Sequence, residues 1–263
     1  MIDLRRDLAA AVHSCLAGVA DLLLPDVCAG CQADHVAAEG LCADCSAELL
    51  SLVALPYCPR CATTLGPNVP ARMDGCGGCQ STLPRFDRVF RLGPYTTCLR
   101  RLIRDLKYRR RQRLRRRMGR LLAERVAREW DGGDLDVVVP VPMHWRRRME
   151  RGFDHARAIA ARLAAELGLP LSDELLRTRH TPPQVHLPRS RRVENVRGAF
   201  AARSPAALEG ANVLLVDDVT TTGATVAEAT RTLREARTHH VAVAVLAKAE
   251  PPTAYAEHLR HPG

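Results

Sequence analysis

Hydrophobic and polar positions alternate along the second half of the chain in a pattern that predicts a parallel β-sheet. Apolar runs typical of strands occur at 136–141, 213–216 and 241–246, and helical patterns occur near 153–168 and 224–236. Strands that alternate with helices form βαβ units. We therefore predict an α/β domain over residues 83–250, with a short tail at 251–263.

Helical spacing marks two further segments. Near the start of the chain it predicts an amphipathic helix over 1–24, in which Asp3, Asp7 and Asp21 argue against a signal peptide. No run approaches the roughly 18 apolar residues of a transmembrane helix, so none is expected. Over 99–129 one long helix is predicted, whose apolar stripe is Leu99, Leu102, Ile103, Leu106, Leu114, Met118, Leu121 and Leu122.

The formal net charge of +10 is concentrated in this predicted helix. Residues 100–120 contain twelve of the 39 basic residues and one of the 29 acidic residues, so the rest of the chain is nearly neutral. A charge run is most often a solvated helix face. So many unbalanced charges nevertheless favour a polyanionic partner, with nucleic-acid phosphates bound without base readout. The candidate residues are Lys107, Arg109, Arg110, Arg111, Arg113, Arg115, Arg116 and Arg117.

Eight of the ten cysteines form four C-x-x-C pairs within 52 residues. Each pair supplies half of a tetrahedral zinc site, and four thiolates leave no position open for water, so the metal would be structural. A disulfide framework is the alternative, but it belongs to secreted proteins. Whether the pairs hold one Zn²⁺ or two, and whether they interleave, stays open. The predicted ribbon spans 25–82, and its ligands are Cys28, Cys31, Cys42, Cys45, Cys58, Cys61, Cys76 and Cys79.

The stretch VDDVTTTGAT, residues 216–225, places two acids and a loop of hydroxyls directly after a buried strand. Ligands of parallel sheets bind at the carboxyl ends of strands, near a helix N-terminus. Two acids would repel a bare phosphate, but they can accept hydrogen bonds from the hydroxyls of a ribose 5-phosphate while the loop holds the phosphate. An ordinary strand-to-turn junction with a helix cap is the structural alternative.

Several motifs together resemble a known family. VLLVDDVTTTGAT resembles the signature of type I phosphoribosyltransferases, which bind phosphoribosyl pyrophosphate (PRPP). VPVPMHWRRRMERGFDHARAIA, the pair Thr181 and Gln184, NVRGAF at 195–200 and YTTCLRRLIRDLKYRR resemble the ComF family of competence proteins. In that family a zinc ribbon precedes a phosphoribosyltransferase domain, so the resemblance implies a Rossmann-like parallel sheet behind a Cys-rich zinc ribbon.

The resemblance also implies roles for individual residues. Asp217 and Asp218 would hold the ribose hydroxyls, and the 5-phosphate would bind Thr221, Thr222, Gly223, Ala224 and Thr225. Mg²⁺ would bridge pyrophosphate and sugar. The pyrophosphate candidates are the loop at Pro140, Val141 and Pro142 and the residues Arg146, Arg147, Arg148 and Arg151, although a basic helix face would read the same.

At the level of biology, the resemblance implies a cytoplasmic protein that binds single-stranded DNA and serves DNA uptake or the use of external DNA. DNA-uptake or helicase proteins are its candidate partners. Two departures stand out: Asp154-His155 replaces the usual Asn-Gln after Arg151-Gly152-Phe153, and Thr221 replaces the acid of hypoxanthine-type enzymes.

Two functions stay open at this point. The protein is either a phosphoribosyltransferase with an unknown nitrogen acceptor or a non-catalytic, nucleic-acid-binding adaptor that responds to PRPP or a nucleotide. No general base is evident: His144 and His155 are possible, but such histidines are more often structural or solvent-exposed.

Overall fold

The computed structural model describes residues 27–34, 40–79, 86–108, 112–144, 149, 154–181, 188 and 191–250. The predicted helix at 1–24 and the predicted tail at 251–263 lie outside these residues. The centre of the fold is a four-stranded parallel sheet in the order β1-β6-β5-β2. Its strands are β1 (Arg88–Pro94), β2 (Val137–Pro140), β5 (Asn212–Thr220) and β6 (His240–Lys248).

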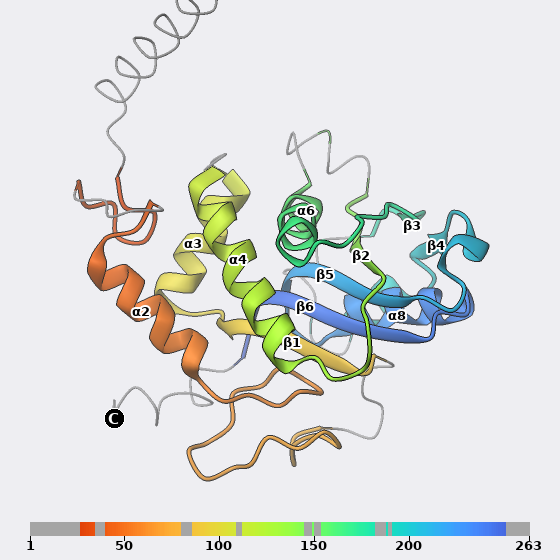
Figure 1. Ribbon diagram of the computed structural model, residues 1–263, viewed down its shortest axis with the longest axis horizontal. Helices are drawn as coiled ribbons and strands as arrows, with labels where there is room; N and C mark the ends of the chain where they lie inside the picture. Colours follow the sequence, from red (N-terminus) through yellow and green to blue (C-terminus); the bar gives the residue numbers. More distant parts are fainter. Residues whose placement is uncertain are drawn as a thin grey trace, which may run out of the picture.

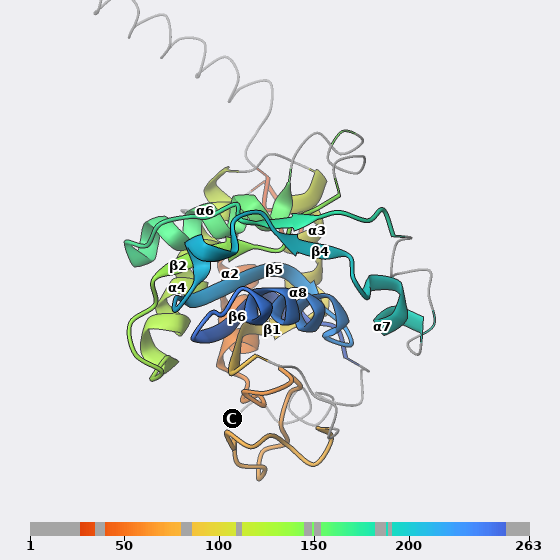
Figure 2. The ribbon, with the colours of Figure 1, turned by 90° about the vertical axis from the view of Figure 1, so that its right-hand side faces the viewer.

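Helices cover both faces of this sheet (Figures 1 and 2). One face packs against α3 (Thr97–Tyr108), α4 (Gln112–Glu129) and α6 (His155–Leu167), and the other packs against α8 (Ala224–Glu235). Alternate residues of one strand enter opposite cores: Leu214 and Val216 belong to the first core, Val213 and Leu215 to the second. Strands buried on both faces read as continuous apolar runs, which is why the sequence pattern located them.

The strands predicted at 136–141, 213–216 and 241–246 and the helices predicted near 153–168 and 224–236 are confirmed, with one informative extension. The run predicted at 213–216 belongs to a longer strand, β5, which continues through both aspartates to Thr220. Its pairing with β6 extends to the Thr220–Lys248 register. Both aspartates therefore belong to the carboxyl-terminal end of strand β5 and not to the loop that follows it.

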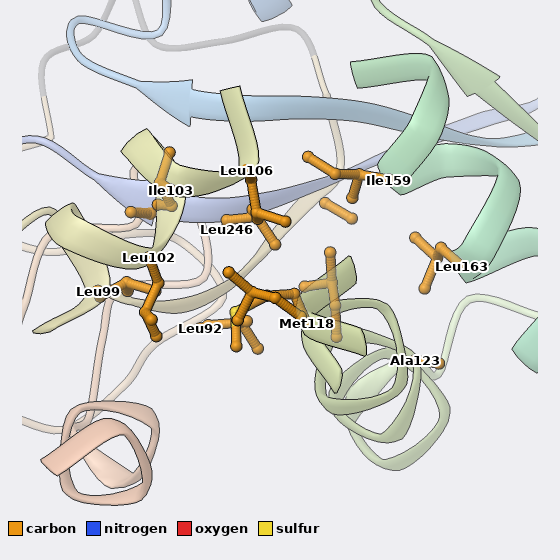
Figure 3. Close-up of a cluster of buried hydrophobic side chains, with 14 of the residues drawn as sticks. Leu92, Leu99, Leu102, Ile103, Leu106, Met118, Ala123, Ile159, Leu163 and Leu246 are labelled. Atoms are coloured by element: carbon orange, nitrogen blue, oxygen red, sulfur yellow. The ribbon is translucent and has the colours of Figure 1, made fainter. Parts of the chain in front are cut away.

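The predicted single basic helix at 99–129 is instead two helices, α3 and α4, which pack into the same core (Figure 1). Its predicted apolar stripe is nevertheless confirmed, because seven of its eight members are buried in one core and Leu121 packs against it. Figure 3 shows how Leu99, Leu102 and Leu106 of α3 meet Met118 of α4 in this core. Gly119 allows α4 to approach α6 closely, since a Cβ there would lie 2.4 Å from Arg162 Cγ.

Three smaller units complete the described chain. The cysteine-rich part contains α2 (Ala43–Ala54), which sits beside β1. The strands β3 (Leu175–Arg177) and β4 (Phe200–Ala202) form an antiparallel pair, and α7 (Arg191–Val196) and the 3₁₀ helix η3 (Pro205–Leu208) flank β4 in the chain. Within the described residues, no helix is both long and apolar enough to cross a membrane.

Candidate functional site

Asp217 and Asp218 lie at the carboxyl end of β5, beside its central neighbour β6. Each carboxylate is half-buried and accepts a backbone N–H of the following residue: Asp217 Oδ1 from Asp218 at 2.8 Å, and Asp218 Oδ1 from Val219 at 2.6 Å. These local bonds hold the carboxylates in fixed orientations. Two oriented, partly exposed carboxylates at a strand end are suited to accept hydrogen bonds from a polyhydroxylated ligand.

The loop after the acids turns directly into α8. Gly223 is the N-cap of this helix, with φ +81°, a left-handed conformation that costs an L-residue with a side chain about 1–2 kcal/mol. Thr222 Oγ1 accepts the Ala224 N–H at 3.4 Å. The first-turn N–H groups of a 12-residue helix, together with the helix dipole, favour an anion at this end.

The last residue of β6 and the residue after it hold this loop in place. Ala249 donates its N–H to the Thr220 carbonyl at 2.8 Å, and the Lys248 ammonium donates to the Thr221 carbonyl. Lys248 is buried, with 6% of its surface exposed. Sequence reasoning missed Lys248 because its contact depends on the β5–β6 register, although a lysine ending an otherwise apolar strand is a visible irregularity.

The predicted pyrophosphate loop is adjacent to the same strand. Val141 donates its N–H to the Val216 carbonyl at 2.8 Å, which sets Pro140, Val141 and Pro142 next to the segment that carries the acids. Asp154 caps α6 by accepting the Arg157 N–H at 3.1 Å and also accepts the Met143 N–H at 3.2 Å. The four remaining candidates of this group, Arg146, Arg147, Arg148 and Arg151, lie outside the described residues.

His144 and His155, the candidate bases, are both buried, at 6% and 3% exposure. The His144 ring packs edge-on against His180, with centroids 4.9 Å apart. His155 is the first residue of α6 and lies among the buried residues of that helix. These environments fit packing roles for both imidazoles.

The cysteine pairs come together as neighbours along the chain. Cys28, Cys31, Cys42 and Cys45 form one cluster, whose sulfurs all lie within 4.8 Å of one another. Cys42 is the N-cap of α2 and its sulfur accepts the Cys45 N–H at 3.4 Å, so the second half of this site opens a helix. Gly30 is needed for close approach, because a Cβ there would lie 2.5 Å from Cys45 Sγ.

Cys58, Cys61, Cys76 and Cys79 form the second cluster. Its sulfurs lie 3.6 Å (Cys58–Cys79) and 3.7 Å (Cys61–Cys76) apart. Four sulfurs placed about 2.3 Å from a tetrahedral Zn²⁺ would be about 3.8 Å apart, whereas a disulfide needs about 2.05 Å. The donor set and spacing therefore fit structural zinc, and the described cysteines are free thiols.

The thiol pKa values show why these clusters suit a cation. Burial raises the pKa of Cys28, but N–H donors of Cys42, Cys31 and Gly30 outweigh it and lower that pKa to about 6. The Cys58 thiol hydrogen-bonds Cys61 and lowers the Cys61 pKa to about 4, while the pKa of Cys58 itself rises. In the first cluster burial raises the pKa of Cys45, so each cluster has one thiol whose pKa is lowered and one whose pKa is raised, and a bound cation would stabilise all four thiolates.

The structure describes the side chains of four of the eight basic residues that were predicted to bind nucleic acid. Arg113 and Arg116 are exposed on α4, and Arg115 and Arg117 are half-buried. The side chain of Lys107 and the residues Arg109, Arg110 and Arg111 lie outside the description. Sequence reasoning left out three exposed arginines of α3 that extend the basic surface: Arg100, Arg101 and Arg104.

Cys98 lies beside the first cluster and links it to α3. It is fully buried, as predicted for a small apolar residue, and its N–H donates to Glu48 Oε1 at 3.0 Å. Its sulfur lies within 4.8 Å of Cys45 Sγ and a Glu48 oxygen. Cys15, predicted to be buried in the same way, lies outside the described residues.

Comparison with known proteins agrees with this geometry. Residues 108–260 match the phosphoribosyl transferase domain, and residues 19–80 match the double zinc ribbon domain. The amidophosphoribosyltransferase of Escherichia coli is 34% identical over 120 residues, which is 45% of this chain and 21% of that protein. The chain is therefore a phosphoribosyltransferase-domain protein with a double zinc ribbon at its N-terminal side.

Two relatives narrow this class to a family. The DNA utilization protein YhgH of Salmonella typhi is 34% identical over 213 residues, covering 79% of this chain and 90% of that protein. Competence protein F of Haemophilus influenzae is 32% identical over 228 residues, covering 84% and 96%. The chain belongs to the ComF family, as its motifs predicted.

Proposed function

We propose that this protein binds PRPP at the carboxyl end of β5. The observation that carries the proposal is that Asp217 and Asp218 end β5 and that a glycine-capped loop then leads into α8. The two carboxylates would accept the 2- and 3-hydroxyls of the ribose, and N–H groups of 221–225 would donate to the 5-phosphate. The loop at 140–142 would face the pyrophosphate.

Mg²⁺ would bind with PRPP rather than in a site made by the protein alone. Carboxylate, phosphate and hydroxyl oxygens are the ligands that this hard cation prefers, and Asp217 and Asp218 supply the protein's share of them. The ion would neutralise charge on the pyrophosphate. Arg146, Arg148 and Arg151 are the residues that we propose to share this task from the protein side.

As an enzyme, the protein would catalyse displacement at the anomeric carbon. The bond from C1 to the pyrophosphate oxygen would break, a bond from C1 to an acceptor nitrogen would form, and the acceptor's proton would pass to water. The burial of His144 and His155 favours the second candidate, an adaptor that binds PRPP or a nucleotide without turnover, because these imidazoles were the candidate bases.

We further propose that the α3–α4 surface binds single-stranded DNA in the cytoplasm, during DNA uptake or the use of external DNA. Exposed arginines on both helices support this, and so do relatives named for DNA utilization and competence. Contacts to phosphates, rather than base stacking, would dominate, since aromatic residues are 4% of the chain.

Titration calorimetry of PRPP with Mg²⁺ tests the ribose-phosphate site. Wild type should bind saturably, and Asp217→Asn/Asp218→Asn should abolish binding while the far-UV spectrum and zinc content stay unchanged. A folded, zinc-loaded wild type that binds no PRPP would refute the proposal. Pyrophosphate release on adding nucleobases, nucleosides or DNA would favour the enzyme, and its absence across this panel would favour the adaptor.

A further inference from the structure

A buried ion cluster joins the second cysteine cluster to the phosphoribosyltransferase sheet. Arg91 of β1 and Glu250, two residues beyond β6, form an ion pair of 3.0 Å with side chains only 1% and 2% exposed. The Arg91 guanidinium also lies over the Tyr57 ring, 5.3 Å from its centroid. Tyr57 directly precedes Cys58 of the second cysteine cluster, and Arg91 belongs to β1. This contact therefore joins the cysteine cluster to the sheet.

Thr64 completes the cluster from the ribbon side. It pairs with Tyr57 as an isolated antiparallel bridge that encloses Cys58 and Cys61. Its N–H donates to Glu250 Oε2 at 2.9 Å, and its hydroxyl donates to Glu250 Oε1 and accepts from Arg91 Nη2 at 2.6 Å. Thr64 thus hydrogen-bonds both members of a pair that is withdrawn from water, where an unpaired charge is costly.

The segment that carries Glu250 also holds the proposed phosphate loop. Lys248 donates to the Thr221 carbonyl and Ala249 donates to the Thr220 carbonyl at 2.8 Å. Three consecutive residues, 248–250, therefore contact the loop at 220–221 on one side and the zinc ribbon on the other.

We propose that the second cysteine cluster positions the PRPP loop through Thr64, Glu250 and Lys248. This inference rests on the proposed function, and it assigns to Thr64, Glu250 and Lys248 the role of positioning residues. A loaded zinc site fixes the bridge between Tyr57 and Thr64, and that bridge fixes Glu250. Without this bridge the buried Arg91–Glu250 pair must rearrange. The carbonyls of Thr220 and Thr221 then lose the hydrogen bonds from Ala249 and Lys248 that set the conformation of the loop.

Thr64→Val tests the contact with minimal disturbance, because valine keeps the shape and the backbone N–H but removes the hydroxyl. We expect the Kd for PRPP with Mg²⁺ to rise about fivefold or more. We also expect faster amide hydrogen exchange at 220–225, with no change in α6. Arg72→Ala is the matched control, because Arg72 belongs to the same ribbon but is 66% exposed and its ion pair among the described residues is with the nearby Asp74. Equal effects from both variants would overturn the proposal.

A comparison of the two clusters tests the role of the metal. Cys61→Ser in the second cluster should weaken PRPP binding, whereas Cys31→Ser in the first, which adjoins α3, should change it less than twofold. By reciprocity, saturating PRPP should raise the zinc occupancy of the second cluster at equilibrium with a chelator. Equal weakening by the two serine variants would overturn the inference.

The exchange measurement separates this inference from the proposed function. If wild type binds no PRPP, the proposed function fails, but Thr64→Val should still speed exchange at 220–225 relative to Arg72→Ala. Unchanged exchange at these residues would overturn the inference whether or not PRPP binds.

Discussion

The Asp154 carboxylate accepts the backbone N–H of Met143 at 3.2 Å, and its other oxygen caps α6 by accepting the Arg157 N–H at 3.1 Å. One side chain therefore fixes the start of a helix and the end of the proposed pyrophosphate loop. Both contacts use acceptor oxygens, which a carboxylate supplies twice and an amide only once. This gives a physical reason for the acid at a position where the family usually has asparagine.

Asp154→Asn should therefore destabilise the protein although asparagine is an equally good N-cap. One of the two N–H groups loses its acceptor, which should cost about 1 kcal/mol in the free energy of unfolding. Urea denaturation at neutral pH measures this. Glu209→Gln is the control, because the Arg237–Glu209 pair has side chains 80% and 56% exposed and should be worth less than about 0.5 kcal/mol. Equal losses in the two variants would contradict the dual role of Asp154.

Gly223 and Gly168 make a matched pair for testing the phosphate loop. Both have positive φ, +81° and +68°, and at both a Cβ would meet no atom within 4 Å. Alanine at either position should therefore cost about 1–2 kcal/mol of backbone strain and nothing from steric overlap. Only Gly223→Ala should raise the Kd for PRPP, by about tenfold or more, since Gly168 ends α6 and Gly223 begins α8. Denaturation measures the loss of stability, and calorimetry measures the Kd for PRPP. Equal Kd values in the two variants would contradict a role of the Gly223 loop in phosphate binding.

The separation of the cysteine clusters predicts two zinc ions per chain. Native mass spectrometry should show two, and Cys45→Ala should reduce the count to one. Cys98→Ala should leave it at two, because the four ligands of the first cluster are complete without Cys98. A loss of metal in Cys98→Ala would instead make that thiol a ligand.

Local patterns predicted the cysteine clusters and the strand–loop–helix unit because each is formed by residues close in sequence. The C-x-x-C pairs are each closed by a single turn, and the strand–loop–helix unit around Asp217 and Gly223 lies within 24 residues. The pairing of neighbouring cysteines, left open by the sequence, is settled by the clusters themselves. Contacts between residues that are close in sequence could therefore be predicted from the sequence.

Features that depend on distant partners were not readable. The sequence of β1 contains Arg88 and Arg91, so it does not read as a buried strand, yet Arg91 is buried because Glu250 pairs with it across 159 residues. The break between α3 and α4 is equally hidden, since no glycine or proline lies between 97 and 118. The two helices are separate because both pack into one core with α6, and this long-range packing needs no helix-breaking residue in the sequence.

Glu228 gives a prediction for pH dependence. Its carboxylate accepts the Gly198 N–H at 2.6 Å and pairs with Arg231 at 2.8 Å, which joins α8 to the turn before β4. Burial opposes ionisation, but the bonds from Arg231 and Gly198 outweigh it, so the pKa of Glu228 lies below its usual value of 4.5. A depressed pKa means that this contribution to stability is present above pH 4.5 and is lost as the pH falls through the folded-state pKa.

The Gly198 amide resonance reports this titration directly. Its chemical shift should move with a midpoint below 4.5, and Glu228→Gln should remove that transition. The variant also leaves Arg231 with Glu235 as its remaining partner, so the α8 surface stays paired. A midpoint at or above 4.5 would show that burial outweighs the two hydrogen bonds.

The salt dependence of DNA binding tests the arginine surface. Each phosphate contact that is lost should reduce the slope of log K against log salt by about 0.7 for single-stranded DNA. If Arg113 and Arg116 each contact a phosphate, Arg113→Gln/Arg116→Gln should lower the slope by about 1.4 for any base sequence. Arg128→Gln is the control, because Arg128 is also exposed, at 66%, but stands at the end of α4 beside Glu129. Binding that does not change with salt would show that this surface holds no nucleic acid, because phosphate contacts release counterions when they form.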